Sequence, residues 1–131
     1  MMNEHVEGYR HVLSNTLSPS VLLRLLADPL RLRCAALLCL DGLHLDELTQ
    51  TLNLSEATVL RHLASLRLVG VLHCRQGGRT HYYQLHPQLP AWARELIHGV
   101  VGSLIEMGPF NDDRDTLTQL RAPRDKLTTA R

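Results

Sequence analysis

Apolar side chains recur every three to four residues through the first half of this chain, the period of helices that bury one face. The pattern predicts three helices, over residues 21–27, 30–40 and 46–52. The second is apolar nearly all round, so we expect it at the centre of the fold. Pro29 suits the first position of this helix, with Asp28 as its N-cap.

A fourth helix is predicted to begin after Ser55, a residue type that favours the N-cap position. Its apolar positions Val59, Leu63 and Leu66 should face the core. The polar side chains left facing outward are Glu56, Thr58, Arg61, His62 and Ser65. A short helix with outward polar and cationic groups, close behind another short helix, is typical of a DNA-reading element.

After Gly70 the apolar period changes from helical to alternating, which indicates strands. Two β-rich runs, over 71–75 and 79–85, flank a Gly-Gly turn, and this pattern predicts a β-hairpin. A helix-turn-helix followed by a hairpin is a winged helix. A last helix is predicted over 91–107, and its apolar face is wider than a small core requires. We assign part of that face to a homodimer interface.

The length of 131 residues suits a single domain. The predicted fold is mainly α with a small β-hairpin, a winged helix-turn-helix of order α-α-α-α-β-β-α that forms a homodimer. Residues 1–18 are interpreted as an N-terminal arm or helix, with a weak helical pattern. Residues 19–107 form the DNA-binding and dimerisation domain. Residues 108–131 are polar and of mixed charge, and we expect a flexible tail there, with one turn of helix near residues 112–120 as the alternative.

Composition narrows the class of protein. An apolar content of 44% excludes wholesale disorder, whereas a net charge of +1 neither supports nor excludes nucleic-acid binding. The local charge is more informative, because residues 55–86 contain four arginines and one glutamate. No segment reads as a signal peptide or a membrane span, so we expect a cytoplasmic protein. Three cysteines without a close pair indicate reduced thiols.

Several separated motifs carry a family resemblance. They are Leu26-Ala-Asp-Pro-Leu-Arg-Leu-Arg33, Leu54-Ser55 with Val59 and Arg61-His-Leu63, Leu66-Arg67 with Gly70-Val-Leu72, and Gly78-Arg79 with Tyr82-Tyr83-Gln-Leu85. Together they strongly resemble the ArsR/SmtB family of bacterial winged-helix repressors, and residues 86–92 are similar to its arsenic-responsive branch. The resemblance implies a homodimer that binds a partly palindromic operator in double-stranded DNA and releases it when an inducer binds.

The sequence departs from that family at both of the metal sites that the resemblance implies. Arsenic-responsive members carry a Cys-x-Cys pair before a Glu-Leu or Asp-Leu step, and here the corresponding positions hold His44 and Asp46. Because As(III) is bound by soft thiolates, the standard arsenite site is absent. The positions of the zinc site along the last helix hold residues that do not form that site. They are Pro87, Leu89, Val100 and Ser103.

The residues expected to contact DNA lie on the fourth helix and in the wing. They are Ser55, Glu56, Thr58, Arg61 and His62 on the helix, and Arg75, Gln76 and Arg79 in the wing. Arg61 is the strongest candidate, since a guanidinium group can pair bidentately with guanine. The wing residues are expected on phosphate or in the minor groove. The alternatives are solvated surface arginines and a His62 that caps or packs within the helix.

The three cysteines are candidates for thiol sensing. Cys34 and Cys39 lie five positions apart on one predicted helix, which separates them by about 140° around its axis. They therefore do not face one ligand, and each is most simply a small core residue. Cys74, on the first wing strand, could be exposed to an oxidant or a soft metal.

His44 and Asp46 form a second candidate site. An imidazole and a carboxylate could bind Zn, Ni or Co if further ligands came from a partner's N-terminal arm, where His5 and His11 lie. The simpler interpretation is a loop residue and a helix-cap residue. The sequence leaves open whether the cofactor is a transition metal, a metalloid or none.

An enzyme is not indicated, because the chain lacks a Gly-rich phosphate loop, a nucleophile elbow and an HExxH motif. The competing interpretation is a winged helix used only for protein interaction or dimerisation, without inducer or selective DNA binding. The arginine-bearing helix and wing favour the DNA-binding regulator, whereas the low total charge keeps the alternative open.

Overall fold

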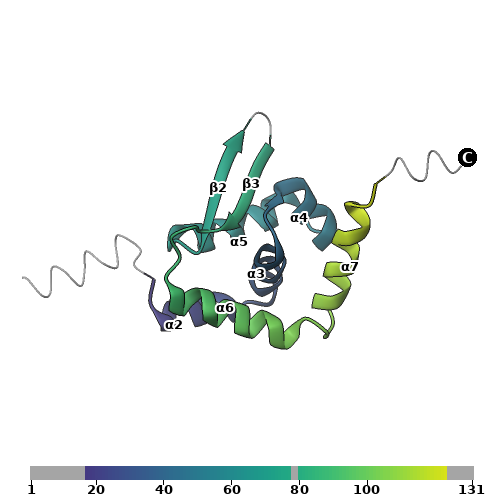
Figure 1. Cartoon of the computed structure of the whole chain (residues 1–131). Helices are drawn as coiled ribbons and strands as arrows, with labels where there is room; N and C mark the ends of the chain where they lie inside the picture. Colours follow the sequence, from purple (N-terminus) through teal and green to yellow (C-terminus); the bar gives the residue numbers. More distant parts are fainter. Residues whose placement is uncertain (1–16, 78–79, 124–131) are drawn as a thin grey trace, which may run out of the picture.

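The computed structural model describes residues 17–77 and 80–123, and Figure 1 shows their arrangement. The elements in chain order are α2 (Pro19–Leu26), α3 (Pro29–Leu40), β1 (Leu43–His44), α4 (Leu45–Leu52), α5 (Glu56–Leu68), β2 (Leu72–Gly77), β3 (Thr80–Leu85), α6 (Ala91–Leu104) and α7 (Phe110–Leu120). The prediction of a mainly helical winged helix with a small hairpin is confirmed. The predicted N-terminal arm lies almost wholly outside the described residues, as do His5, His11 and Arg79.

Local side-chain chemistry sets the helix starts. Ser18 caps α2, and its hydroxyl oxygen accepts a hydrogen bond from the Val21 amide at 3.3 Å. Asp28 caps α3 in the same way, with its carboxylate 2.9 Å from the Arg31 amide. A proline follows each cap, where its missing N–H costs nothing.

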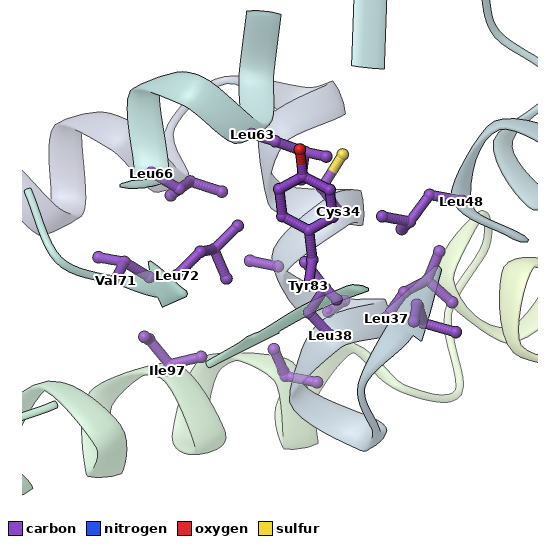
Figure 2. Close-up of a cluster of buried hydrophobic side chains, with 14 of the residues drawn as sticks. Cys34, Leu37, Leu38, Leu48, Leu63, Leu66, Val71, Leu72, Tyr83 and Ile97 are labelled. Atoms are coloured by element: carbon purple, nitrogen blue, oxygen red, sulfur yellow. The ribbon is translucent and has the colours of Figure 1, made fainter. Parts of the chain in front are cut away.

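The apolar helix α3 is central, as its sequence predicts. It packs against α2, α5, α6, α7 and β3, and in Figure 1 it lies in the middle of the ring that the other elements form. Side chains from α4, α5, β2, β3 and α6 lie in one cluster around Cys34, Leu37 and Leu38, as Figure 2 shows. Leu22 of α2 and Leu117 of α7 belong to the same buried core. Burial of each large apolar side chain stabilises the fold by about 1.5–3 kcal/mol. The core therefore fixes α5 and the wing relative to α3.

The sheet has three antiparallel strands in the order β1-β3-β2. The hairpin β2–β3 was predicted, whereas β1 was not, because two residues are too short to show an alternating pattern. Its register places Leu43 opposite Tyr83 and His44 opposite Tyr82. The segment before α4 is thus tied to the base of the wing.

The expectation of a flexible tail from residue 108 is wrong for Phe110–Leu120, which form α7. This helix packs against α3 and α4 and buries Asp113 and Leu117, which lie four residues apart on one face. The apolar pattern did not predict this helix, because its contacts with α3 and α4 depend more on charged side chains than on an apolar face. Residues 124–131 lie outside the described part. Among the helices of residues 17–77 and 80–123, none is long and apolar enough to cross a membrane.

Candidate nucleic-acid interface

The turn between α4 and α5 has the short geometry of a helix-turn-helix. Asn53 ends α4 in the left-handed conformation, at φ 55°, which asparagine tolerates better than most residues. Leu54 then donates its amide hydrogen to the Thr49 carbonyl at 3.2 Å. Leu48 and Leu63 are both fully buried and pack α4 against α5. The orientation of α5 is therefore set by the turn and by the core.

The hydroxyl groups of Ser55 and Thr58 stabilise the first turn of α5. The Ser55 oxygen accepts the Thr58 amide at 3.2 Å and donates its hydroxyl to the Thr58 hydroxyl at 2.8 Å. Glu56 is exposed beside them, where a carboxylate is stabilised by the positive end of the helix dipole. Two of the predicted DNA-contacting residues thus also build the start of the helix.

Arg61 is exposed on the outer face of α5, and it forms no salt bridge within residues 17–77 and 80–123. The inner face of the same helix holds Val59, Leu63 and Leu66, which are fully buried. The guanidinium group is therefore directed away from the core, as the apolar pattern predicted.

His62 is packed inward, which is the alternative to the outward position, because its side chain is buried and the residue is only 5% exposed. Neither ring nitrogen has a hydrogen-bond partner, and Nδ1 lies 3.8 Å from the Asp28 carboxylate, too far for a hydrogen bond. Burial lowers the pKa of His62 below its ordinary value, and the nearby Asp28 opposes that shift. His62 is a packed neutral histidine, so we remove it from the set of DNA contacts.

The wing carries an exposed cation that rests on an aromatic ring. Arg75 on β2 lies opposite Tyr82 on β3, and its guanidinium carbon is 4.8 Å from the centre of the Tyr82 ring. This cation–π contact restricts the arginine without neutralising it. Gln76 is exposed one position further along β2. In Figure 1 the hairpin of β2 and β3 projects away from the helices.

The comparisons with known proteins agree with this geometry. No protein-family model matches the chain. It is 42% identical over 86 residues to the arsenic resistance transcriptional regulator ArsR1 of Pseudomonas putida, covering 65% of this chain and 67% of that protein. It is also 40% identical over 82 residues to the arsenical resistance operon repressor of Escherichia coli, covering 62% and 70%. The chain belongs to the ArsR/SmtB family.

The fold of solved relatives supports the assignment. The structure of HlyU from Vibrio cholerae matches with a TM-score of 0.59 and 28% identity, over 67% of this chain and 91% of that one. The similar proteins are transcriptional regulators, so this ArsR/SmtB family member is a DNA-binding transcriptional regulator and not an enzyme.

His44 and Asp46 lie at the start of α4 in this ArsR/SmtB protein, and the further ligands that their predicted metal site needs, His5 and His11 of a partner, lie outside the described residues. His44 precedes α4, donates its backbone N–H to the Glu47 carboxylate at 2.9 Å and packs its ring edge-on against Tyr82. Asp46 is exposed in the first turn of α4. No group of three or more His, Cys, Asp or Glu in residues 17–77 and 80–123 is placed to hold a metal ion. The positions of the family's arsenite thiolates therefore do not fit arsenite here.

The three cysteines have different surroundings. Cys34 is fully buried, and burial raises its pKa to about 12, so it is a core thiol. Cys74 is half-buried on β2, opposite Tyr83. Cys39 is half-buried near the end of α3, and burial raises its pKa.

The structure brings Cys39 to His98, a pair that sequence reasoning missed. The Cys39 sulfur lies 3.0 Å from Nδ1 of His98 on α6. The two residues are 59 positions apart, so no local pattern in the sequence connects them. A thiol in contact with an imidazole has a neighbouring group able to accept its proton.

Proposed function

We propose that the protein is a homodimeric repressor that binds a partly palindromic operator through α5 and the wing and releases it when an inducer acts. The observation that carries this proposal is the exposed, unpaired Arg61 on the second helix of a helix-turn-helix, in the described part of an ArsR/SmtB chain. The names of the relatives ArsR1 and the arsenical resistance operon repressor support regulation at an operator.

In this proposal the two recognition helices of a dimer enter successive major grooves about 34 Å apart. Arg61 reads a base edge or holds a phosphate, and Arg75, Gln76 and Arg79 of the wing contact phosphate or the minor groove. Ser55 and Thr58 position the first turn at the DNA. Glu56 would repel phosphate, which favours an operator that differs from those of relatives.

Dimerisation is assigned to α6 together with the N-terminal helix predicted within residues 1–18, most of which lies outside the described residues. Trp92 on α6 is 37% exposed and Leu23 on α2 is 52% exposed. A large apolar side chain exposed at this level, such as Trp92 on α6, is typical of an association surface. Sedimentation or light scattering of the full chain tests the oligomeric state directly.

The inducer in this proposal is a thiol-seeking agent, such as a soft metal ion, a metalloid or an oxidant, acting at Cys39. Burial raises the pKa of the Cys39 thiol, and the contact with His98 offsets this effect, since the imidazole can accept the thiol proton as the sulfur reacts or binds. The pair also links α3 to α6, the helix assigned to the dimer interface, so a change there can alter how two subunits meet.

The test is an operator-binding assay with the promoter fragment upstream of the protein's own coding sequence. Arg61→Ala and Arg75→Ala should weaken binding by about fivefold or more, the loss of a direct phosphate or base contact. Arg114→Ala on α7, outside the candidate interface, is the matched control and should bind as the wild type does. Unchanged affinity for both interface variants would remove the assignment.

The same assay with Zn²⁺, As(III), Sb(III) or hydrogen peroxide tests the inducer. The wild type should release DNA with at least one of these agents, and Cys39→Ala should not respond to it. Cys34→Ala, which changes a buried thiol, is the comparison for the loss of any cysteine. Release of Cys39→Ala by the agent that releases the wild type would exclude Cys39 as the site.

A further inference from the structure

An open pocket of about 320 Å³ lies where the end of α5 meets the start of β2. Its walls include Arg67 from the last turn of α5, His73 and Cys74 from β2, and His86 after β3. None of the functions assigned above uses this pocket. Its polar groups therefore call for a separate explanation.

The two histidines of the pocket are held in place by defined contacts. Their rings meet edge to face, with centroids 5.4 Å apart. His86 donates its backbone N–H to the Val71 carbonyl at 2.9 Å, and its Nδ1 accepts the Gln88 amide hydrogen at 3.1 Å. Because Nδ1 is an acceptor, the ring hydrogen of a neutral His86 lies on Nε2. His86 thus keeps an N–H donor on the other side of its ring.

The charged and polar residues that line the pocket indicate which class of ligand it can bind. Arg67 brings a permanent positive charge, His73 and His86 bring imidazoles, and no aspartate or glutamate lines the pocket. A metal cation would be repelled by Arg67, and the described residues offer no group of three metal ligands. Polar walls likewise give an apolar ligand little to bury against. A planar guanidinium group beside N–H donors is suited to an oxyanion.

We propose that this pocket binds a phosphate group through Arg67, His73 and His86. The group has two chemical sources, a free phosphate ion or phosphorylated small molecule, and a backbone phosphate of DNA. Arg67 lies six residues after Arg61, about 120° away around the helix axis and in the last turn of α5. It is therefore separate from the position assigned to base reading. A phosphate held here joins the recognition helix to the first wing strand and fixes the angle between them.

The first arm of the test uses the full chain and inorganic phosphate at constant ionic strength. Titration followed by amide NMR should give saturable shifts at Gly70, His73 and His86. Arg67→Gln should weaken that binding at least about tenfold, because it removes a charge-assisted pair. The control Arg114→Gln should titrate as the wild type does, and thermal unfolding should show that both variants are folded.

The second arm measures operator affinity as a function of salt. If the phosphate comes from DNA, Arg67→Gln reduces the slope of log affinity against log salt by about one. If the ligand is a free phosphate group, Arg67→Gln loses phosphate binding and leaves the salt slope unchanged. Non-saturable phosphate shifts that are equal in wild type and Arg67→Gln, together with an unchanged salt slope, overturn the proposal. The NMR arm needs no operator, so failure of the repressor assignment would be distinguishable.

Discussion

Asp113 on α7 accepts two hydrogen bonds from the Arg33 guanidinium on α3, at 2.8 Å from Nε and 2.7 Å from Nη2. The Asp113 side chain is 7% exposed and that of Arg33 is 22% exposed. Taking such a pair out of water is costly, but the bidentate geometry offsets much of that cost. The pair fastens the last helix to the centre of the fold.

Asp113→Ala should therefore destabilise the protein by about 2 kcal/mol, since it leaves the half-buried Arg33 charge without its partner. Urea unfolding followed by circular dichroism measures the change. Asp115→Ala, on the exposed side of the same helix, is the matched control and should change the free energy of unfolding by less than about 0.5 kcal/mol. Equal effects of the two variants would show that the pair contributes nothing specific.

Arg121 at the end of α7 predicts a pH-dependent contribution to stability. It donates hydrogen bonds to both carboxylate oxygens of Glu47 at 2.8 and 3.0 Å, and the carbonyl of Gly42 accepts another at 2.9 Å. The Arg121 guanidinium lowers the pKa of Glu47 from its usual 4.5. A carboxyl whose pKa is depressed in the fold stabilises it above the unfolded pKa, and this stability is lost as the pH falls through the folded pKa.

The variant Arg121→Gln should consequently cost about 0.5–1 kcal/mol at pH 7, the modest value of a partly exposed pair. The difference between wild type and variant should begin to shrink as the pH falls below about 4.5, the ordinary pKa of the carboxyl group, and should be lost once the pH has fallen through the depressed pKa of Glu47 in the fold. Denaturant titrations of both proteins across this range measure it. Arg114→Gln, whose salt bridge to Glu106 is long at 3.9 Å, is the control. A constant difference at all pH values would contradict the assignment to Glu47.

The burial of His62 makes stability depend on pH. As the pH falls, we expect the stability linked to His62 to be lost at a higher pH than the stability linked to the carboxylates. Burial lowers its folded pKa below 6.5, so the unfolded chain takes up a proton more readily than the folded one. Stability is then complete above about pH 6.5 and falls as the pH decreases toward the folded pKa. His62→Leu should reduce this dependence, and it should leave operator affinity unchanged. His81→Leu, at an exposed position, is the control, and an unaltered pH profile in His62→Leu would contradict the prediction.

The sequence predicted those elements in which buried apolar residues recur at a regular spacing. It did not predict structure that depends on individual contacts between residues far apart in the chain. Helices α2 to α5 and the hairpin follow from their apolar spacing and caps. The last predicted helix extended to residue 107, whereas α6 ends at Leu104. Helix α7 was predicted as no more than one turn in a flexible tail, because Asp113 and Arg121 are held by residues 80 and 74 positions away. A local pattern does not contain that information.

In the candidate site too, the local pattern predicted some residues, whereas others depend on long-range packing. Arg61 was placed outward by the pattern that buries Val59 and Leu63. The position of His62 was also readable, because it lies three residues after Val59 and four before Leu66 on the same face. His62 was predicted to face outward because histidine is polar, although its place in the helix puts it on the buried face. The Cys39–His98 contact had no sequence signal, since it depends on how α3 packs against α6.

Tyr82 should control operator affinity without touching DNA, because its ring supports Arg75 on one strand and contacts His44 on the other. Tyr82→Leu removes the aromatic face, and we expect about two- to fivefold weaker binding, the scale of an exposed cation–π contact. Tyr82→Phe keeps the ring and should bind as the wild type does. Gly42→Ala should weaken binding in the same direction, since an added Cβ would overlap the Tyr82 ring and displace it. Fluorescence anisotropy with the labelled promoter fragment measures all three, and equal affinities for the Leu and Phe variants would show that the ring does not position Arg75.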